Sequence, residues 1–294
     1  ADVEWMLDTL LELKSASLYI CDYQNYIEQE EPEGKREAEI DLRKDFCIRF
    51  EQVKYQYPGR KEEALKDVSV EIRSGEKIAV VGENGAGKTT FISLLVNLIS
   101  GSSGRILLND LDINSYDRDG LKSFFGVVCQ DYQIYPVSVR DNLSVNGAIA
   151  DAKIREAIRK TGLQDRIRDI DQVIGKEISD DGLVLSGGER QKLALARMIA
   201  NDFPVVILDE PTSAVDALAE RKINSIILDA LKDTRRTLVF ISHRLSTTKL
   251  VDRILVFEDG RIVEEGSHMK LMEKKGLYSK LYQEQSNMYK GQGI

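Results

Sequence analysis

The sequence predicts an α/β fold organised around a phosphate-binding loop, and three stretches of the chain indicate it. The first is a glycine-rich loop at 82–90, which fills every fixed position of the pattern GxxxxGK[ST]. The second is an apolar run at 205–208 that ends in two carboxylates, and the third is a serine-glycine-glycine turn at 185–189 that opens a helix with an apolar face. Buried strands and apolar-faced helices next to these stretches make the class α/β.

The glycine-rich loop has the surroundings that its chemistry needs. Residues 77–81 before it are typical of a short buried strand, and residues 89–99 after it have the apolar spacing of a helix. Backbone N–H groups and the positive end of that helix then point into one concavity, where phosphate oxygens can replace water. Lys88 would contact the β- and γ-phosphates, and the Thr89 hydroxyl would ligate a bridging Mg²⁺. The simpler alternative is a glycine-rich turn between a strand and a helix.

Composition excludes several classes of protein. The 294 residues are enough for one large domain or two small ones, and a net charge of −8 argues against a broad basic face for nucleic acid. Cys21, Cys47 and Cys129 lack metal-ligand spacing, so we expect reduced thiols in a cytosolic compartment and no metal cluster. No run approaches the roughly 18 apolar residues of a membrane span, and no signal-peptide pattern is present. The sequence therefore predicts a soluble chain.

The chain is expected to begin with an amphipathic helix, at 1–29, whose apolar side needs a partner. That partner is either another helix or the chain's own domain. Residues 30–44 are rich in glutamate and predict a solvated linker, after which a folded domain should occupy 45–294. Within it, residues 47–57 and 68–72 alternate apolar and polar side chains, which indicates half-buried antiparallel strands, and Pro58 and Gly59 form a turn between them.

The apolar run at 205–208 is followed by Asp209 and Glu210. Buried strands rarely end in paired acids for packing reasons alone. Asp209 at a strand end is placed to hold Mg²⁺ or its water shell, while Glu210 points another way and could polarise an attacking water. The alternative for Asp209 is a helix N-cap or a loop acid. Together with the phosphate loop, the pair predicts a nucleoside triphosphatase.

The turn formed by Leu185, Ser186, Gly187, Gly188 and Glu189 is the most diagnostic stretch. Exposed N–H groups and the helix dipole make such a turn a second anion site, although without its context it reads equally well as a helix cap. Lying between the two nucleotide motifs, it resembles the signature LSGGQ of the ATP-binding cassette (ABC) family. The departure is mild, because the family's phosphate contacts fall to the serine and glycines and only the final Gln is replaced, by Glu189.

The resemblance extends over about 45–285, through seven motifs in the family's order. It implies a P-loop NTPase (RecA/F1-like) core with an antiparallel β subdomain and an inserted α-helical subdomain at about 130–195. It further implies roles for individual residues. The implied ATP contacts are Tyr57, Gly82, Asn84, Gly85, Ala86, Gly87, Lys88, Thr89, Thr90, Ser186, Gly187, Gly188 and Asp216. The implied Mg²⁺ ligands are Thr89, Gln130 and Asp209, and the implied catalytic residues are Glu210, His243, Lys88 and Gln130.

For three of these residues a plainer interpretation remains. Gln130 looks like the glutamine at a strand end that reaches Mg²⁺, but it could be a polar loop residue. Tyr57 looks like the aromatic that stacks on adenine, but it could be a core tyrosine at a strand end. His243 looks like the histidine that contacts the γ-phosphate, but it could be a capping or core histidine.

The resemblance also implies partners. A signature turn far in sequence from the phosphate loop closes, in the family, on the nucleotide of a second copy, so two copies would pair head to tail around two Mg-ATP. Glu210 would polarise the attacking water, with charge neutralised by Mg²⁺, Lys88 and the partner's Ser186. The flanking segments look like those of exporters, in which residues 1–29 would be the cytosolic end of a transmembrane domain. The chain would then be a fragment of a longer half-transporter and would lie at the cytoplasmic face of a membrane. Its partner would be a second copy, in a homodimer, or a related half-transporter.

Three rival classes remain to be weighed. A free-standing cytosolic ATPase of the same superfamily predicts twin cassettes, a long coiled-coil insertion or a basic face, and the sequence shows none of these. A module that binds ATP without cleaving it would commonly lack Glu210 or His243, which are both present. A small-molecule phosphotransferase would leave 185–189 unexplained. The exported substrate is not indicated by any of these residues.

Overall fold

The computed structural model describes residues 38–42, 44–129, 132–145, 147–176, 180–209, 235–241 and 245–291. The expected helix at 1–29 and most of the expected linker lie outside these residues. From Ala38 onward the chain forms one compact unit. Ala38 pairs with Tyr116 in an isolated bridge and Ile40 packs against the core, so the end of the expected linker already belongs to this unit. Both side chains are apolar and find an apolar surface to cover.

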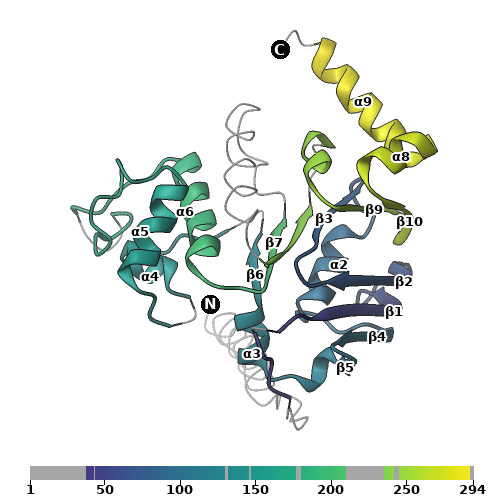
Figure 1. The fold of residues 1–294 in the computed structure, drawn as a ribbon, viewed down its shortest axis with the longest axis horizontal. Helices are drawn as coiled ribbons and strands as arrows, with labels where there is room; N and C mark the ends of the chain where they lie inside the picture. Colours follow the sequence, from purple (N-terminus) through teal and green to yellow (C-terminus); the bar gives the residue numbers. More distant parts are fainter. Residues whose placement is uncertain are drawn as a thin grey trace, which may run out of the picture. The chain divides into compact units, whose positions relative to one another are not determined.

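A six-stranded sheet crosses the centre of this unit (Figure 1). Its strands, in the order in which they pair, are β10 (Arg261–Gly266), β9 (Arg253–Glu258), β3 (Lys77–Gly82), β8 (Thr237–Ile241), β7 (Val205–Asp209) and β6 (Phe125–Val128). All neighbours pair in parallel except β9 and β10. The parallel strands are almost continuously apolar because both faces of the sheet are covered. The predicted strands at 77–81 and 205–208 are confirmed.

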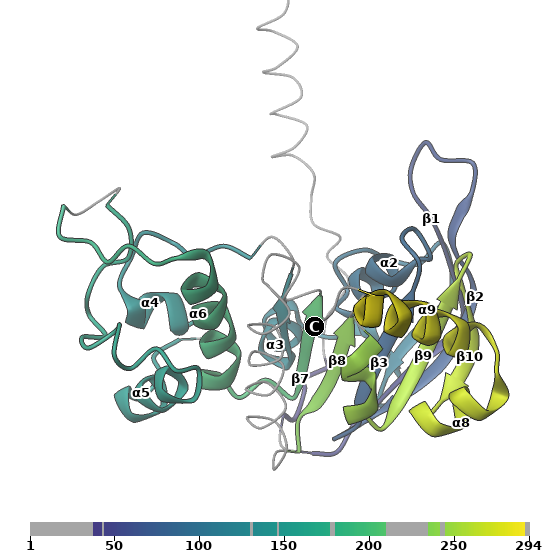
Figure 2. The ribbon, with the colours of Figure 1, turned by 90° about the horizontal axis from the view of Figure 1, so that it is seen from above.

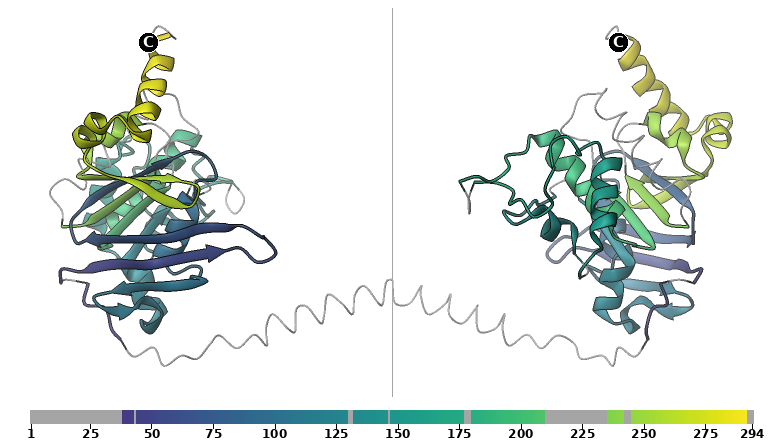
Figure 3. Two further views of the ribbon diagram at one scale, coloured as in Figure 1. Left: turned by 90° about the vertical axis from the view of Figure 1, so that its right-hand side faces the viewer. Right: turned by 60° about the vertical axis from the view of Figure 1, so that its left-hand side comes forward.

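A second, antiparallel sheet packs beside the first. It contains β2 (Glu63–Arg73), β1 (Cys47–Gln56), β4 (Ser103–Leu108) and the short β5 (Leu111–Asp112). Strand β2 contacts β10 where the two sheets meet (Figure 3). The predicted antiparallel pair is confirmed, but β2 begins before residue 68. The apolar alternation of β2 is interrupted near its start, so the sequence does not reveal where the strand begins. Leu65 and Val68 are three residues apart and both are buried, because Asp67 between them takes a left-handed φ of 62°.

Helix α2 (Lys88–Leu95) lies between the two sheets (Figure 2). Its residues Phe91, Leu94 and Leu95 are fully buried, together with the apolar faces of β1, β2, β3 and β9. The helix was expected to continue to residue 99. It stops at Leu95 because Asn97 adopts a left-handed φ of 57°, a conformation that asparagine tolerates better than most residues and that ends helices.

The opposite face of the six-stranded sheet packs on helices. Near β6 to β8 these are α4 (Val139–Leu143), α5 (Asp151–Lys160) and α6 (Gly187–Ala200), with their own core, and α3 (Arg118–Phe124) precedes β6. Near β3 and β9 they are η2 (Leu245–Leu250), α8 (His268–Lys274) and α9 (Leu277–Gly291). The period of two along β7 sends Val205 and Ile207 to the side of α2 and Val206 and Leu208 to the side of α6.

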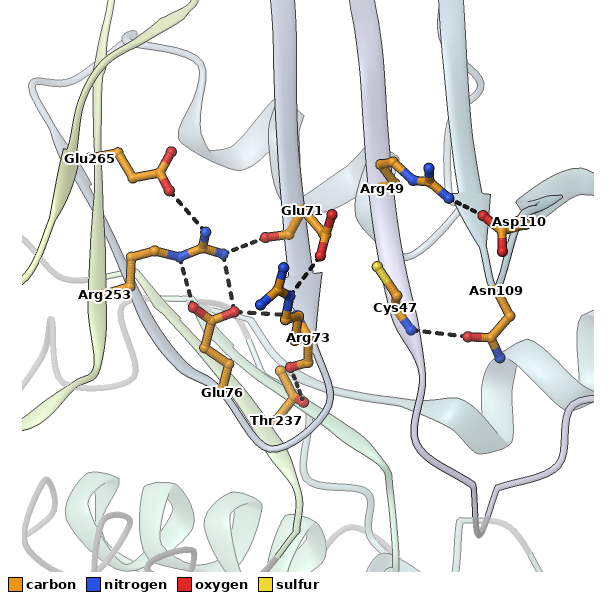
Figure 4. A network of polar contacts seen from close by, with 10 residues as sticks. All are labelled: Cys47, Arg49, Glu71, Arg73, Glu76, Asn109, Asp110, Thr237, Arg253 and Glu265. Atoms are coloured by element: carbon orange, nitrogen blue, oxygen red, sulfur yellow. Dashed lines mark hydrogen bonds and ion pairs between the residues drawn. The ribbon is translucent and has the colours of Figure 1, made fainter.

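A polar cluster joins the two sheets at the end remote from the phosphate loop (Figure 4). Arg253 of β9 donates to the Glu76 carboxylate at 3.0 Å and to Glu265 of β10 at 2.9 Å. Glu76 also accepts from the backbone N–H of Arg73, and the Thr237 hydroxyl of β8 donates to the Arg73 carbonyl at 3.2 Å. Arg253 and Glu76 are 20% and 18% exposed, so water screens this pair less than a surface pair.

Replacement of Arg253 tests the contribution of this cluster. We expect Arg253→Met to lower the free energy of unfolding by about 2–3 kcal/mol, because Glu76 keeps a charge that is largely shielded from water and loses its partner. Urea denaturation followed by circular dichroism measures the change. Arg105→Met is the control, because Arg105 and its partner Glu51 form an exposed pair, for which we expect about 0.5 kcal/mol or less. Equal losses in the two variants would contradict the argument.

Candidate functional site

The phosphate loop has the conformation that its glycines permit. Gly87 precedes α2 with a left-handed φ of 101°, and a Cβ there would lie 2.8 Å from the Ala64 carbonyl oxygen and 2.8 Å from the Leu65 side chain. A Cβ on Gly82 would lie 2.3 Å from the Phe257 carbonyl oxygen. These two positions therefore accept only glycine, because the neighbouring backbone of β2 and β9 cannot move aside.

The start of α2 is open to a ligand. Its N-cap is Gly87, which has no side chain, so no side chain caps the first N–H groups of this helix. The Lys88 ammonium donates to the carbonyl oxygens of Gly82 and Glu83 at 2.9 and 2.8 Å, and only 5% of Lys88 is exposed. The lysine charge is thereby held over the loop. The backbone N–H groups at the start of the helix, the helix dipole and this ammonium together suit a phosphate group.

A cavity of about 640 Å³ extends from the loop toward β1 and β2. Seven of the predicted nucleotide contacts line it: Tyr57, Asn84, Gly85, Gly87, Lys88, Thr89 and Thr90. Ala86 does not line the cavity, because it is 6% exposed and packs in the core. Gly82 lies at the base of the loop, at the end of β3.

Tyr57 lines the same cavity and directly follows β1. Its hydroxyl is 3.1 Å from the Thr90 hydroxyl, and its ring meets that of Tyr55 edge-on with centroids 4.9 Å apart. Tyr55 is 9% exposed and Tyr57 is 38% exposed. The core tyrosine of the pair is thus Tyr55, while Tyr57 presents part of its ring to the cavity, where a planar base could stack on it.

Asp209 lies at the same edge of the sheet as the phosphate loop. It pairs with Ile241 of β8, and Ile241 pairs with Val80 of β3, which leads into the loop. Two strand spacings, about 10 Å, therefore separate the backbone of Asp209 from that of Val80. Parallel strands bring their carboxyl ends to one edge, where α/β sheets bind ligands.

The oxygen donors at this edge suit Mg²⁺. Thr89 is exposed in the cavity and Asp209 ends β7, so this edge carries a hydroxyl and a carboxylate. In the described ranges no cluster of three or more His, Cys, Asp or Glu side chains could hold a metal ion. Mg²⁺ commonly uses one or two protein oxygens and takes its other ligands from phosphate and water, so this sparse donor set fits it.

The signature turn caps α6, as predicted. The Ser186 hydroxyl accepts from the Glu189 N–H at 3.4 Å, and the Glu189 carboxylate accepts from the Ser186 N–H at 2.8 Å and from its hydroxyl at 3.0 Å. These bonds form a capping box. The Ser186 N–H, with smaller help from the Arg166 guanidinium, lowers the pKa of Glu189. Glu189 in place of glutamine therefore retains a structural role, as an ionised partner of Ser186.

Gly187 and Gly188 differ from the glycines of the phosphate loop. A Cβ at either position would meet no atom within 4 Å, and neither glycine has a positive φ. The protomer itself therefore does not require glycine here, although glycine costs a helix about 1 kcal/mol relative to alanine. Glycine at both positions leaves room for another molecule to approach the backbone closely.

The two anion sites do not meet in one protomer. Ser186, Gly187 and Gly188 are absent from the lining of the nucleotide cavity and belong to the helices beside β6, whereas the phosphate loop follows β3. The predicted residues Gln130, Glu210, Asp216 and His243 lie outside the described residues, so their placement stays a prediction.

The turn between β9 and β10 also belongs to the site, and the motifs did not predict it. Asp259 and Gly260 both line the cavity, and the Gly260 N–H donates to the Ala86 carbonyl at 3.1 Å. A Cβ on Gly260 would lie 2.8 Å from the Ala64 carbonyl oxygen. The Asp-Gly pair does signal a hairpin turn, but nothing in the sequence places it against a loop so far away along the chain.

Comparison with known proteins identifies the family. Residues 65–213, just over half of the chain, match the family described as "ABC transporter". The chain belongs to the ABC transporter family. The resemblance stated from the motifs, and with it the P-loop NTPase fold, is confirmed.

The relatives that the chain matches include a flippase, a transporter and an exporter. The chain is 38% identical over 257 residues to the ATP-dependent lipid A-core flippase of Yersinia pestis, covering 87% of this chain and 43% of that protein. It is also 38% identical over 281 residues to the mitochondrial iron-sulfur clusters transporter ATM1 of Chaetomium globosum, covering 95% and 44%. Among solved structures, a bacterial Atm1-family ABC exporter with ATP bound aligns with a TM-score of 0.78 at 29% identity, covering 93% of this chain and 48% of that one.

The chain therefore spans less than half the length of these relatives, and its part corresponds to the ATPase domain of an ABC transporter. None of the helices in the described part of the chain has the length and apolarity needed to cross a membrane.

Lys88 provides a test of the phosphate site. We expect Lys88→Met to weaken ATP binding by about 10- to 100-fold, because a hydrogen bond to a charged group contributes about 1.5–3 kcal/mol. Isothermal titration calorimetry measures the affinity, with circular dichroism to verify the fold. Lys122→Met removes an exposed ammonium that pairs with Asp119 on α3, and we expect it to bind ATP like the unaltered protein. An affinity of Lys88→Met within about twofold of that protein would refute the assigned role.

Proposed function

We propose that this chain is the ATP-hydrolysing nucleotide-binding domain of an ABC exporter, which pairs head to tail with a second copy or a related half-transporter around two Mg-ATP. The observation that carries the proposal is the separation of two anion sites within one protomer. One is the cavity at the phosphate loop, and the other is the start of α6, where Gly187 and Gly188 face open space. A two-fold pairing would join each cavity to the other copy's α6 and complete two sites.

The chain's own residues would divide the work of hydrolysis. Tyr57 would stack on the base, and the α2 N-terminus with Lys88 would bind the β- and γ-phosphates. Thr89 and Asp209, with Gln130, would hold Mg²⁺, which when bound neutralises phosphate charge. Glu210 would polarise the attacking water, Ser186 of the second copy would contact the γ-phosphate, and His243 would hold these groups in register.

Coupling to transport is part of the same proposal. Loss of the bridging γ-phosphate would remove the contacts that hold the two copies together, so the pair would open as rigid bodies. The pair would lie at the cytoplasmic face of a membrane. A transmembrane domain attached to it would convert the opening of the pair into export of a substrate. The relatives are named for different substrates, a lipid A-core and iron-sulfur clusters, and the residues that the structure describes do not indicate either of them.

The solution mass of Glu210→Gln tests the pairing. Without a group to polarise water, bound ATP should persist, so we expect a monomer that becomes a dimer only when Mg-ATP is added. Size-exclusion chromatography with light scattering gives the mass.

The matched variant adds Gly187→Glu to Glu210→Gln. The glutamate side chain has space in the protomer, so folding and ATP binding should persist. In the dimer, the same side chain would collide with the second copy and place a negative charge against the phosphates of the ATP bound there. We expect no dimer from this double variant. If Glu210→Gln and the double variant form the Mg-ATP-dependent dimer equally well, the proposed pairing through α6 is ruled out.

A further inference from the structure

The Glu189 carboxylate occupies the hydrogen-bonding groups of Ser186 in the protomer. One of its oxygens, Oε2, accepts from the Ser186 backbone N–H at 2.8 Å and from the Ser186 hydroxyl at 3.0 Å. An ionised carboxylate has no proton to donate, so the single proton of the Ser186 hydroxyl points to Glu189. The hydroxyl oxygen accepts in turn from the Glu189 backbone N–H at 3.4 Å.

This arrangement leaves the Ser186 hydroxyl without a proton for a second acceptor. The oxygens of a γ-phosphate are acceptors, so a hydroxyl must donate to contact them. The Ser186 proton can therefore be given to Glu189 or to a phosphate, but not to both at once. Contact between Ser186 and the ATP of a second copy thus requires loss of the hydroxyl bond to Glu189.

Glu189 also places a negative charge at this anion site. A phosphate oxygen that accepts from Ser186 would lie within about 6 Å of the Glu189 oxygen, because each of the two hydrogen bonds spans about 3 Å. The Ser186 N–H lowers the pKa of Glu189, so the carboxylate is ionised at neutral pH. Its side chain is 29% exposed, so water screens the charge only in part. The carboxylate and a phosphate at this distance repel each other.

The Arg166 guanidinium offsets part of this charge. Its Nε lies 3.5 Å from the other Glu189 oxygen, Oε1, and its Nη2 donates at 2.7 Å to the carbonyl of Val184, just before the signature turn. The Arg166 side chain is 49% exposed, so solvent weakens the ion pair. Arg166 therefore reduces the negative charge that a phosphate would meet, without cancelling it.

Glutamine at position 189 would keep the helix cap and remove both obstacles. Glutamate and glutamine serve equally in a capping box, because each offers an oxygen to the Ser186 N–H. A neutral amide oxygen holds a hydroxyl proton less firmly than a carboxylate does, so Ser186 would turn more readily to a phosphate. The amide also carries no charge to repel that phosphate.

We propose that Glu189 limits the affinity between two copies of the domain, as an ionised competitor for Ser186 that the γ-phosphate of the other copy must displace, and that Arg166 partly offsets it. The inference rests on the proposed function, in which Ser186 contacts the nucleotide of a second copy. A two-fold pair of identical copies contains this competition twice. The closed pair should therefore separate more readily than the same pair with glutamine at position 189.

The expected effect is on pairing and not on the single protomer. Glu189 does not line the nucleotide cavity, so its replacement should leave the affinity of one copy for ATP unchanged. Glu189→Gln keeps the capping box, so the melting temperature of the ATP-free protein should also stay the same. A merely structural role of Glu189 would change the melting temperature and leave the affinity between copies unaltered.

The experiment compares Glu210→Gln with the double variant Glu210→Gln and Glu189→Gln, each in the full 294-residue chain. Sedimentation velocity in Mg-ATP, at a series of protein concentrations, gives the dissociation constant of the dimer. Glu156→Gln in the same Glu210→Gln background is the matched control. It makes the same change of charge on α5, where the Glu156 carboxylate pairs with Arg159 of its own helix.

Replacement of Arg166 tests whether the effect of Glu189 is electrostatic. We expect Arg166→Gln to weaken the dimer by about threefold or more where residue 189 is glutamate, because the carboxylate then lacks its neutralising partner. Where residue 189 is glutamine, the same replacement should have a smaller effect. Equal weakening in the two backgrounds would overturn the role assigned to Arg166.

We expect Glu189→Gln to lower the dissociation constant of the dimer by about tenfold or more, and Glu156→Gln to leave it within about twofold. A dissociation constant that Glu189→Gln leaves equal or raises would overturn the inference, while the proposed function would stand on the Mg-ATP-dependent dimer. If Glu189→Gln does not fold, Arg166→Gln decides, and an unweakened dimer contradicts the inference. If no variant forms a dimer with Mg-ATP, the proposed function fails and the inference fails with it.

Discussion

The parallel pairing of β3 with β8, and of β8 with β7, is the constraint on which the rest of the structure depends. It brings Val80, Ile241 and Asp209 into one row at a single edge of the sheet. The phosphate loop after β3, Asp209 at the end of β7 and Ile241 at the end of β8 therefore lie at the same edge because of backbone hydrogen bonds, whatever their separation in sequence. Along β7, alternate side chains are buried on the side of α2 and on the side of α6, and this packing fixes the register. A slip of one residue would move each side chain to the opposite face of the sheet.

The antiparallel sheet and the turn between β9 and β10 complete the cavity by close packing. Ala64, Leu65 and Gly260 approach the loop so closely that Gly87 has no room for a side chain. The Gly260 N–H donates to the Ala86 carbonyl, so the turn between β9 and β10 supports the loop that lines the cavity. A loop held in this way need not rearrange when an anion arrives. The shape of the site thus comes from β2, β9 and β10 as much as from the motif itself.

The sequence predicted those features that local chemistry determines. A cradle for phosphate needs glycine and lysine at fixed spacing, and buried parallel strands need continuous apolar runs, so the loop, α6 and the central strands could be located. The sequence did not reveal the early start of β2 or the early end of α2, because Asp67 and Asn97 adopt left-handed conformations that no periodicity signals. Nor did it reveal the contacts of Gly260 with the loop or of Gln285 with Leu245, because these depend on tertiary packing between distant segments. The assignments of Gln130, Glu210, Asp216 and His243 still rest on their motifs.

The two glycines at the start of α6 lower the stability of the protomer and leave space for a second molecule. Neither is required by the protomer's backbone or packing, and each weakens the helix that it opens. A protomer with alanine at these positions would unfold less readily, and it would also present two methyl groups where a second molecule must come close. Selection for thermal stability alone would therefore replace these glycines. Their presence indicates that this surface is under selection for a property other than stability.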